Sequence, residues 1–117
     1  MGPALLVLVS YVFGGAFLAN AVPHLVSGAL GRPFQTPFAK PSGRGLSSST
    51  VNVAWGAFNL AAAYLLVCHV GAFDLRDPGD AAALGAGLLA MNLHHARHFG
   101  RLHGGAAPQA MRETAKD

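Results

Sequence analysis

Two long uncharged stretches constrain this 117-residue chain more than any other feature. The first runs from Ala4 to Val26 and the second from Val51 to Phe73, and neither contains Asp, Glu, Lys or Arg. A helix needs about 20 apolar residues to cross the hydrocarbon core of a bilayer, which is about 30 Å thick. Two such stretches in one short chain predict an integral membrane protein.

The composition excludes several other classes. Hydrophobic residues make up 52% of the chain and charged residues only 11%, which is unlike an ordinary soluble domain. The net charge is +3, but the basic residues are too dispersed for a nucleic-acid surface, so we expect membrane lipids and no nucleic acid as partners. Cys68 is the only cysteine, which excludes an internal disulfide.

A third helix is predicted from a weaker signal. Residues 81–93 contain only Asn92 as a strongly polar side chain, but at 1.5 Å per residue they cover only about 20 Å. To cross the bilayer, this helix must continue to about residue 101, where long arginine side chains can reach the interface. We expect an all-α bundle with transmembrane helices at about 4–26, 51–72 and 80–101. The alternative for the third is an interfacial helix.

The segments outside the helices also carry predictions. Residues 27–50 are rich in Pro and Gly, and we expect an interfacial loop there. Its two phenylalanines, Phe34 and Phe38, have basic neighbours and fit a loop pressed onto lipid headgroups or an ordered loop with local packing. Residues 1–104 would then form the transmembrane domain, and residues 105–117 a disordered tail.

The basic residues predict how the helices are oriented. Three spans put residues 27–50 and the C-terminal part on the same side, and these hold seven of the eight Lys and Arg residues. The connector after the second span holds Arg76 alone. The positive-inside rule makes the basic side cytoplasmic, with the N-terminus outside.

This threading collects polar side chains at one depth, in the cytoplasmic half of the bilayer. Asn20 and His24 are four residues apart, so they share one face of the first helix. Amides in membrane helices commonly hydrogen-bond to a neighbouring helix, so plain packing is the other interpretation. The candidate residues for a pocket are Asn20, His24, Asn52, Trp55, Asn59, Asn92 and His95.

On the third helix, the small and polar residues define the face that we expect to meet the other two helices. That face consists of Ala81, Gly85, Asn92 and Ala96, with His95 at its flank. Arg97 and Arg101 point the other way, and we expect them to contact lipid headgroups.

The histidines raise the question of a cofactor. Neutral imidazoles bind haem iron and other transition metals, so His24, His95 and His98 are the candidate ligands. Such a site would depend on histidine alone, because no carboxylate lies within the spans. The sequence shows no nucleophile–base pair either, so we do not expect an enzyme.

Three motifs support the membrane prediction. They are Asn-x-x-Pro-His at 20–24, Gly-Arg-Pro-Phe-x-x-Pro-Phe-Ala at 31–39 and Asn-x-x-Trp-Gly-x-x-Asn at 52–59. Together they resemble a family of small uncharacterised multi-pass membrane proteins of bacteria, and the likeness covers most of the chain. The resemblance implies a multi-pass protein of the bacterial cytoplasmic (inner) membrane, and it implies no substrate.

Three functions remain open at this point. The first is a non-enzymatic module that forms oligomers or joins a larger membrane complex, because glycine-rich helix faces suit close docking. The second is a pocket for a lipid or small ligand in the cytoplasmic half of the membrane. The third is haem or metal binding by histidine.

Overall fold

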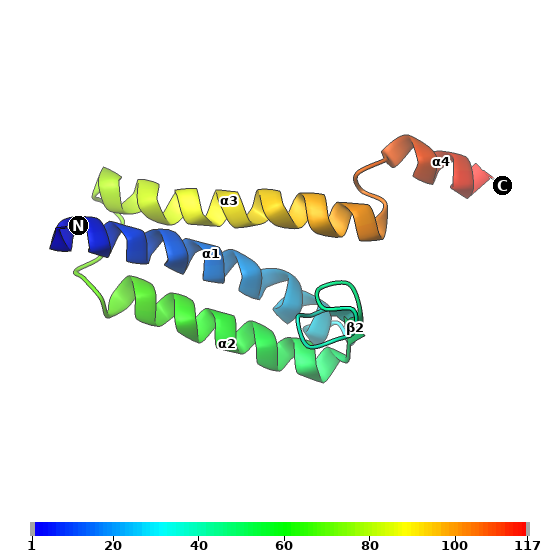
Figure 1. The fold of residues 1–117 in the computed structure, drawn as a ribbon, viewed down its shortest axis with the longest axis horizontal. Coiled ribbons are helices and arrows are strands. Elements are labelled where there is room, and N and C mark those ends of the chain that lie inside the picture. Colours follow the sequence, from blue (N-terminus) through cyan, green and yellow to red (C-terminus); the bar gives the residue numbers. More distant parts are fainter. Residues whose placement is uncertain (1, 117) are drawn as a thin grey trace.

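The computed structural model describes residues 2–116, which are mostly helical. Three long helices follow one another up and down: α1 (Pro3–Ala29), α2 (Ser49–Cys68) and α3 (Pro78–His103). Figure 1 shows them as a row in which α1 lies between the other two. Both outer helices pack along α1, whereas α2 and α3 have few contacts with each other.

The helix ends follow from capping residues. The Ser48 hydroxyl accepts a hydrogen bond from the amide of Val51 at the start of α2, and the Asp77 carboxylate caps α3 through the amides of Gly79 and Asp80. Gly104 ends α3 in the left-handed conformation, at φ +89°.

α2 is shorter than the predicted 51–72, because the chain turns toward α1 after Cys68. Gly71 lies so close to α1 that an added Cβ would meet Val7 and the Tyr11 hydroxyl. Phe73 then packs edge-on against the Tyr11 ring, with 5.0 Å between centroids. These contacts close the second connector over the start of α1.

Glycines set the close approach of the helices. A Cβ at Gly15 would overlap the carbonyl oxygen of Leu84 on α3, and one at Gly87 would overlap the carbonyl oxygen of Val12 on α1. Gly56 on α2 lies similarly against Leu25 of α1. These three glycines therefore serve packing within the chain.

The expected face of α3 is wrong. Gly85, Asn92 and Ala96 are exposed, whereas Gly87 is buried and His95 is half-buried against α1. Residues two positions apart lie about 200° apart around a helix, so choosing Gly87 instead of Gly85 turns the helix nearly over. The helix is oriented with Gly87 toward α1. In this orientation Gly87 lies against the Val12 carbonyl and His95 reaches Asn20 of α1.

Within residues 2–116, α1 and α2 are the helices long and apolar enough to cross a membrane; α3 does not pass the same test. Only 33% of the apolar window of α1 and 22% of that of α2 are buried, whereas a core helix of a soluble protein is mostly buried. Large apolar side chains therefore cover the outer surface, among them Phe13, Val22, Phe58, Tyr64 and Leu65.

The first connector contains a small sheet. Strand β1 (Phe34–Gln35) pairs antiparallel with β2 (Leu46–Ser47), so that Phe34 faces Ser47. Phe34 packs inward, 4.7 Å from the ring of Phe99, while Phe38 is 62% exposed. The connector thus has local packing at Phe34 and a surface aromatic at Phe38.

The tail differs from the expected disorder. Residues Pro108–Lys116 form a helix, α4, which points away from the three-helix row in Figure 1. Pro108 suits the first helical turn, and most of the following residues are good helix formers. Met111 contacts Gly104, but every residue of α4 is exposed.

Candidate functional site

Asn52 is the centre of the first polar cluster. Its side chain is fully buried. Its amide nitrogen donates to the carbonyl oxygens of Phe34, Ser47 and Ser48 at 3.0–3.1 Å. Three carbonyls around one end of the amide fix its orientation, so Oδ1 is left as an acceptor. Asn52 thereby ties both strands of the connector to the start of α2.

His24 hydrogen-bonds to that acceptor. Its Nδ1 lies 2.7 Å from Asn52 Oδ1, and the imidazole is buried on α1. Because Oδ1 can only accept, Nδ1 must carry the proton. In a neutral imidazole, Nε2 then keeps its lone pair and is an available acceptor or ligand.

A second chain of hydrogen bonds crosses all three helices. Asn59 donates to the carbonyl of Trp55 at 2.8 Å, which fixes its amide orientation, and Asn20 donates to Asn59 Oδ1 at 2.9 Å. The remaining Asn20 oxygen accepts from His95 Nε2 at 2.8 Å. His95 therefore carries its proton on Nε2, and Nδ1 keeps the lone pair when the ring is neutral.

These two clusters border one hollow, which we call the histidine pocket. Its volume is about 230 Å³, and it lies between α1, the first connector and α3. The polar side chains in its wall include Asn20, His24, Thr36, Trp55, His94, His95 and His98. Its wall contains no carboxylate and no cysteine.

The predicted pocket residues divide into three groups. Asn20, His24, Trp55 and His95 line the histidine pocket. Asn52 and Asn59 are fully buried behind it and hold the lining residues in place. Asn92 is exposed on the outer face of α3 and does not belong to the site.

The sequence does not predict the part of the pocket wall that the connector supplies. Gln35, Thr36 and Gly43 line the pocket because the strand pair folds back over the helix ends. Thr36 is buried and shares a short hydrogen bond with the hydroxyl of Ser47. A polar residue in a Pro- and Gly-rich loop has no local sequence pattern that marks it as part of a pocket wall. Only the strand pairing reveals it.

Trp55 contains an unsatisfied group. Its indole Nε1 is buried and has no hydrogen-bond partner among residues 2–116. The ring lies 6.4 Å from that of His24, is stacked on Phe58 at 5.5 Å and meets Phe38 edge-on at 4.9 Å. A donor left unpaired in this way costs about 1–3 kcal/mol.

The metal hypothesis gains no support. Among the described residues, no group of three or more His, Cys, Asp or Glu side chains could hold a metal ion. One of the candidates, His98, has its Nε2 close to the carbonyl oxygen of Gly43, to which it must donate. The structure therefore does not assemble His24, His95 and His98 as a ligand set.

The two predicted headgroup residues differ in their surroundings. Arg97 is exposed on α3 and borders none of the hollows described here. Arg101 is also exposed, but it borders a second hollow of about 350 Å³ together with Arg44 of the connector and His98.

No protein-family model, curated protein or solved structure matches this chain.

Proposed function

We propose that this chain is a membrane protein that binds a small ligand or lipid in the histidine pocket without transforming it. The observation that supports this most is the pair of hydrogen-bonded clusters. They fix the rings of His24 and His95 at the pocket wall, and each neutral ring retains one nitrogen with a free lone pair.

The free-energy cost of burying these polar side chains favours a role beyond packing. Burying amides and imidazoles among apolar helices is unfavourable unless every group finds a partner. Polar groups at membrane depth are accordingly rare and tend to mark functional sites. Here Asn52 and Asn59 complete their hydrogen bonds, while His24 Nε2 and His95 Nδ1 have no hydrogen bond to any residue that the structure describes.

The membrane topology is part of the proposal. α1 and α2 are apolar enough to span, and α3 packs backbone to backbone along α1 at Gly15 and Gly87. If α1 crosses the bilayer, α3 must lie at the same depth, so we propose three spans. The basic residues then orient the connector and the C-terminus toward the cytoplasm, in a bacterial inner membrane.

Binding is favoured over catalysis because the pocket lacks reactive pairs. Its only hydroxyl in the wall, that of Thr36, already bonds to Ser47, and no acid or thiol is present. His24 and Asn52 form an oriented pair, but a base without a nucleophile or an acid does not define a reaction.

Native mass spectrometry of the full chain, extracted in a mild detergent, tests the proposal. We expect a non-protein adduct on the wild-type protein that is lost in His24→Gln and retained in Asn92→Ala. The second variant is matched because it removes a polar side chain that lies outside the pocket. An adduct that survives His24→Gln, or no adduct in any form, contradicts ligand binding at this site.

Self-association is a second candidate, supported by a different surface. An apolar groove of about 590 Å³ follows α2, with Leu18 of α1 and Leu84 of α3 at its edges. Gly15, Gly56 and Gly87 pack within the chain, so the groove is the feature that supports a helical partner.

Crosslinking in membranes tests self-association through this groove. Ala61→Trp, which fills the groove, should abolish a discrete oligomer. A monomer in the wild type contradicts self-association.

A further inference from the structure

We propose that the ligand of the histidine pocket is a phosphate-bearing lipid, with its phosphate held between Arg44 and Arg101. This inference rests on the proposed function, because it names the class of molecule that the same site takes. It is carried by three adjoining hollows that change from basic to polar to apolar along the connector end of the protein.

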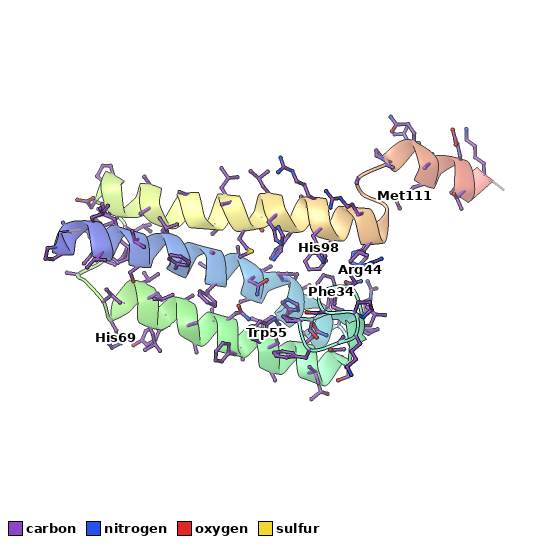
Figure 2. The ribbon with its side chains drawn as sticks, in the orientation of Figure 1. Phe34, Arg44, Trp55, His69, His98 and Met111 are labelled. Carbon is purple, nitrogen blue, oxygen red and sulfur yellow. The ribbon has the colours of Figure 1, made fainter. Side chains whose placement is uncertain are left out.

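The basic hollow supplies the phosphate site. Arg44 comes from the connector and Arg101 from the last turn of α3, 57 positions further along the chain, yet both border the same hollow of about 350 Å³. Figure 2 shows Arg44 close to His98 where the connector approaches α3. Guanidinium groups match the oxygen geometry of phosphate and bind it through charge-assisted hydrogen bonds.

The position of Arg44 is fixed by its loop. Gly43 donates its amide to the Thr36 carbonyl at 2.9 Å and accepts from His98 on α3 through its own carbonyl. The amide of Arg44 donates to Pro41 at 3.0 Å. His98 thus acts as a positioning residue, which holds the connector, and with it Arg44, against α3.

The acidic residues that the structure describes do not neutralise this end of the protein. Three of the four acidic residues that the structure describes are Asp74, Asp77 and Asp80, in or next to the second connector. That connector joins α2 to α3 at the opposite end of the row from the first connector (Figure 1). The fourth, Glu113, lies on α4, which points away. An anion is therefore the ligand that this hollow suits by charge.

The other two hollows extend the site toward the apolar surface. His98 borders both the basic hollow and the histidine pocket, so these two adjoin. Trp55 borders both the histidine pocket and an apolar groove of about 480 Å³ that Phe38, Val51 and Phe58 help to line. A molecule with a phosphate, a polar linkage and an acyl chain matches this order.

The polar linkage finds complementary groups in the middle hollow. The indole N–H of Trp55 has no acceptor within residues 2–116, and an ester carbonyl oxygen is an acceptor that a small movement of the ring would bring within reach. A hydroxyl on the ligand can donate to His24 Nε2, since the Asn52 bond leaves that nitrogen as an acceptor.

The same chemistry could be met by free phosphate, and fluorescence can separate the two sources. Trp55 is the only tryptophan, and it lies at the junction of the polar and apolar hollows. The full-length protein in detergent is titrated with dioctanoyl phosphatidic acid, with dioctanoylglycerol and with inorganic phosphate. We expect a saturable change with phosphatidic acid at concentrations about tenfold lower than with either of the others.

Variants assign the phosphate to its two arginines. We expect Arg44→Gln and Arg101→Gln each to weaken phosphatidic acid about tenfold and to leave dioctanoylglycerol unchanged, because only the charged contact is lost. Arg97→Gln is the matched control: it removes an exposed arginine of the same helix that does not border the basic hollow. It should bind both lipids like the wild type.

The outcomes separate the inference from the function on which it rests. Equal affinity for phosphatidic acid and dioctanoylglycerol, both weakened by His24→Gln, overturns the phosphate site and keeps the pocket. Tighter binding of inorganic phosphate than of phosphatidic acid overturns the lipid. A lack of response to all three probes, together with no adduct in mass spectrometry, removes the proposed function as well.

Discussion

Asn52 links the first connector to two helices through a single amide. Its Oδ1 accepts from His24, and its two amide hydrogens are shared among three carbonyl groups of the connector and the helix start. Removal of the amide would leave the buried Nδ1–H of His24 without its acceptor, and the carbonyl groups of Phe34 and Ser47 would each lose a donor. Much of the order at this end of the protein therefore depends on one side chain.

Loss of the Asn52 side chain is expected to destabilise the fold. Asn52→Ala should lower the free energy of unfolding by about 1–3 kcal/mol for each buried group left without a partner. Asn92→Ala, on the exposed face of α3, should change it by less than about 0.5 kcal/mol. Thermal unfolding in detergent, followed by circular dichroism, measures both. Equal midpoints for the two variants would show that Asn52 is not needed for the fold.

The second prediction concerns the unpaired indole. Trp55→Phe removes the buried N–H but keeps an aromatic ring against Phe38 and Phe58. We expect the unfolding midpoint to stay the same or to rise. Removing the unpaired buried N–H relieves its desolvation cost, and this gain offsets the contact area that the smaller ring loses. A fall worth more than about 2 kcal/mol would mean that the indole has a partner in the folded protein.

At the scale of elements, close backbone contact decides how the helices are rotated. α1 meets α3 where Gly15 and Gly87 remove the side chain between the two backbones. The polar contact between Asn20 and His95 lies further along the same interface, five residues beyond Gly15 on α1 and eight beyond Gly87 on α3. The orientation that brings the glycines together is thus the one that completes the hydrogen bonds.

Two glycines on α3 allow a matched test of that contact. Gly87→Ala should destabilise the fold by about 1–3 kcal/mol, because the new methyl group meets the Val12 carbonyl and forces the helices apart. Gly85→Ala meets nothing within 4 Å and should be neutral or stabilising by up to about 1 kcal/mol. Unfolding midpoints compare them, and a larger loss at Gly85 would refute this orientation of α3.

The sequence predicts the elements well and the faces less well. Uncharged runs locate α1 and α2, since length and hydropathy are properties of the chain alone. The polar residues of α1 and α2 also pair: His24 with Asn52, and Asn20 with Asn59. The face of α3 could not be predicted, because Gly85 and Gly87 are equally small and only the shape of α1 selects between them.

The strand pair of the first connector could not be predicted from the sequence for a related reason. A two-residue strand pair carries almost no sequence pattern, and its register depends on Asn52, which lies outside both strands. Thr36 and Gly43 enter the pocket wall through that register. Long-range hydrogen bonds of this kind leave no trace in local composition.

At the scale of the molecule, the row of three helices has two distinct ends. Arg44 and the histidine pocket lie at the end that the first connector caps, and the three aspartates lie near the other. The concentration of basic residues at one end, with apolar surface between the two ends, is what the proposed three-span topology predicts.

Chemical labelling tests that placement. In a Cys68→Ser background, Ser42→Cys in the first connector and Ala107→Cys beyond α3 should react with an impermeant maleimide from the same side of sealed vesicles. Leu75→Cys, in the second connector, should react only from the opposite side. Labelling of Ser42→Cys and Leu75→Cys from one side would exclude the three-span topology.

The central position of α1 has a consequence for how the protein is made. As the chain leaves the ribosome, α1 and α2 emerge first and can already join His24 to Asn52 and Asn20 to Asn59. His95 reaches Asn20 only after most of α3 has been synthesised. The nascent hairpin therefore already carries Asn20, His24 and Trp55 of the pocket wall, and the site becomes complete when α3 packs against α1.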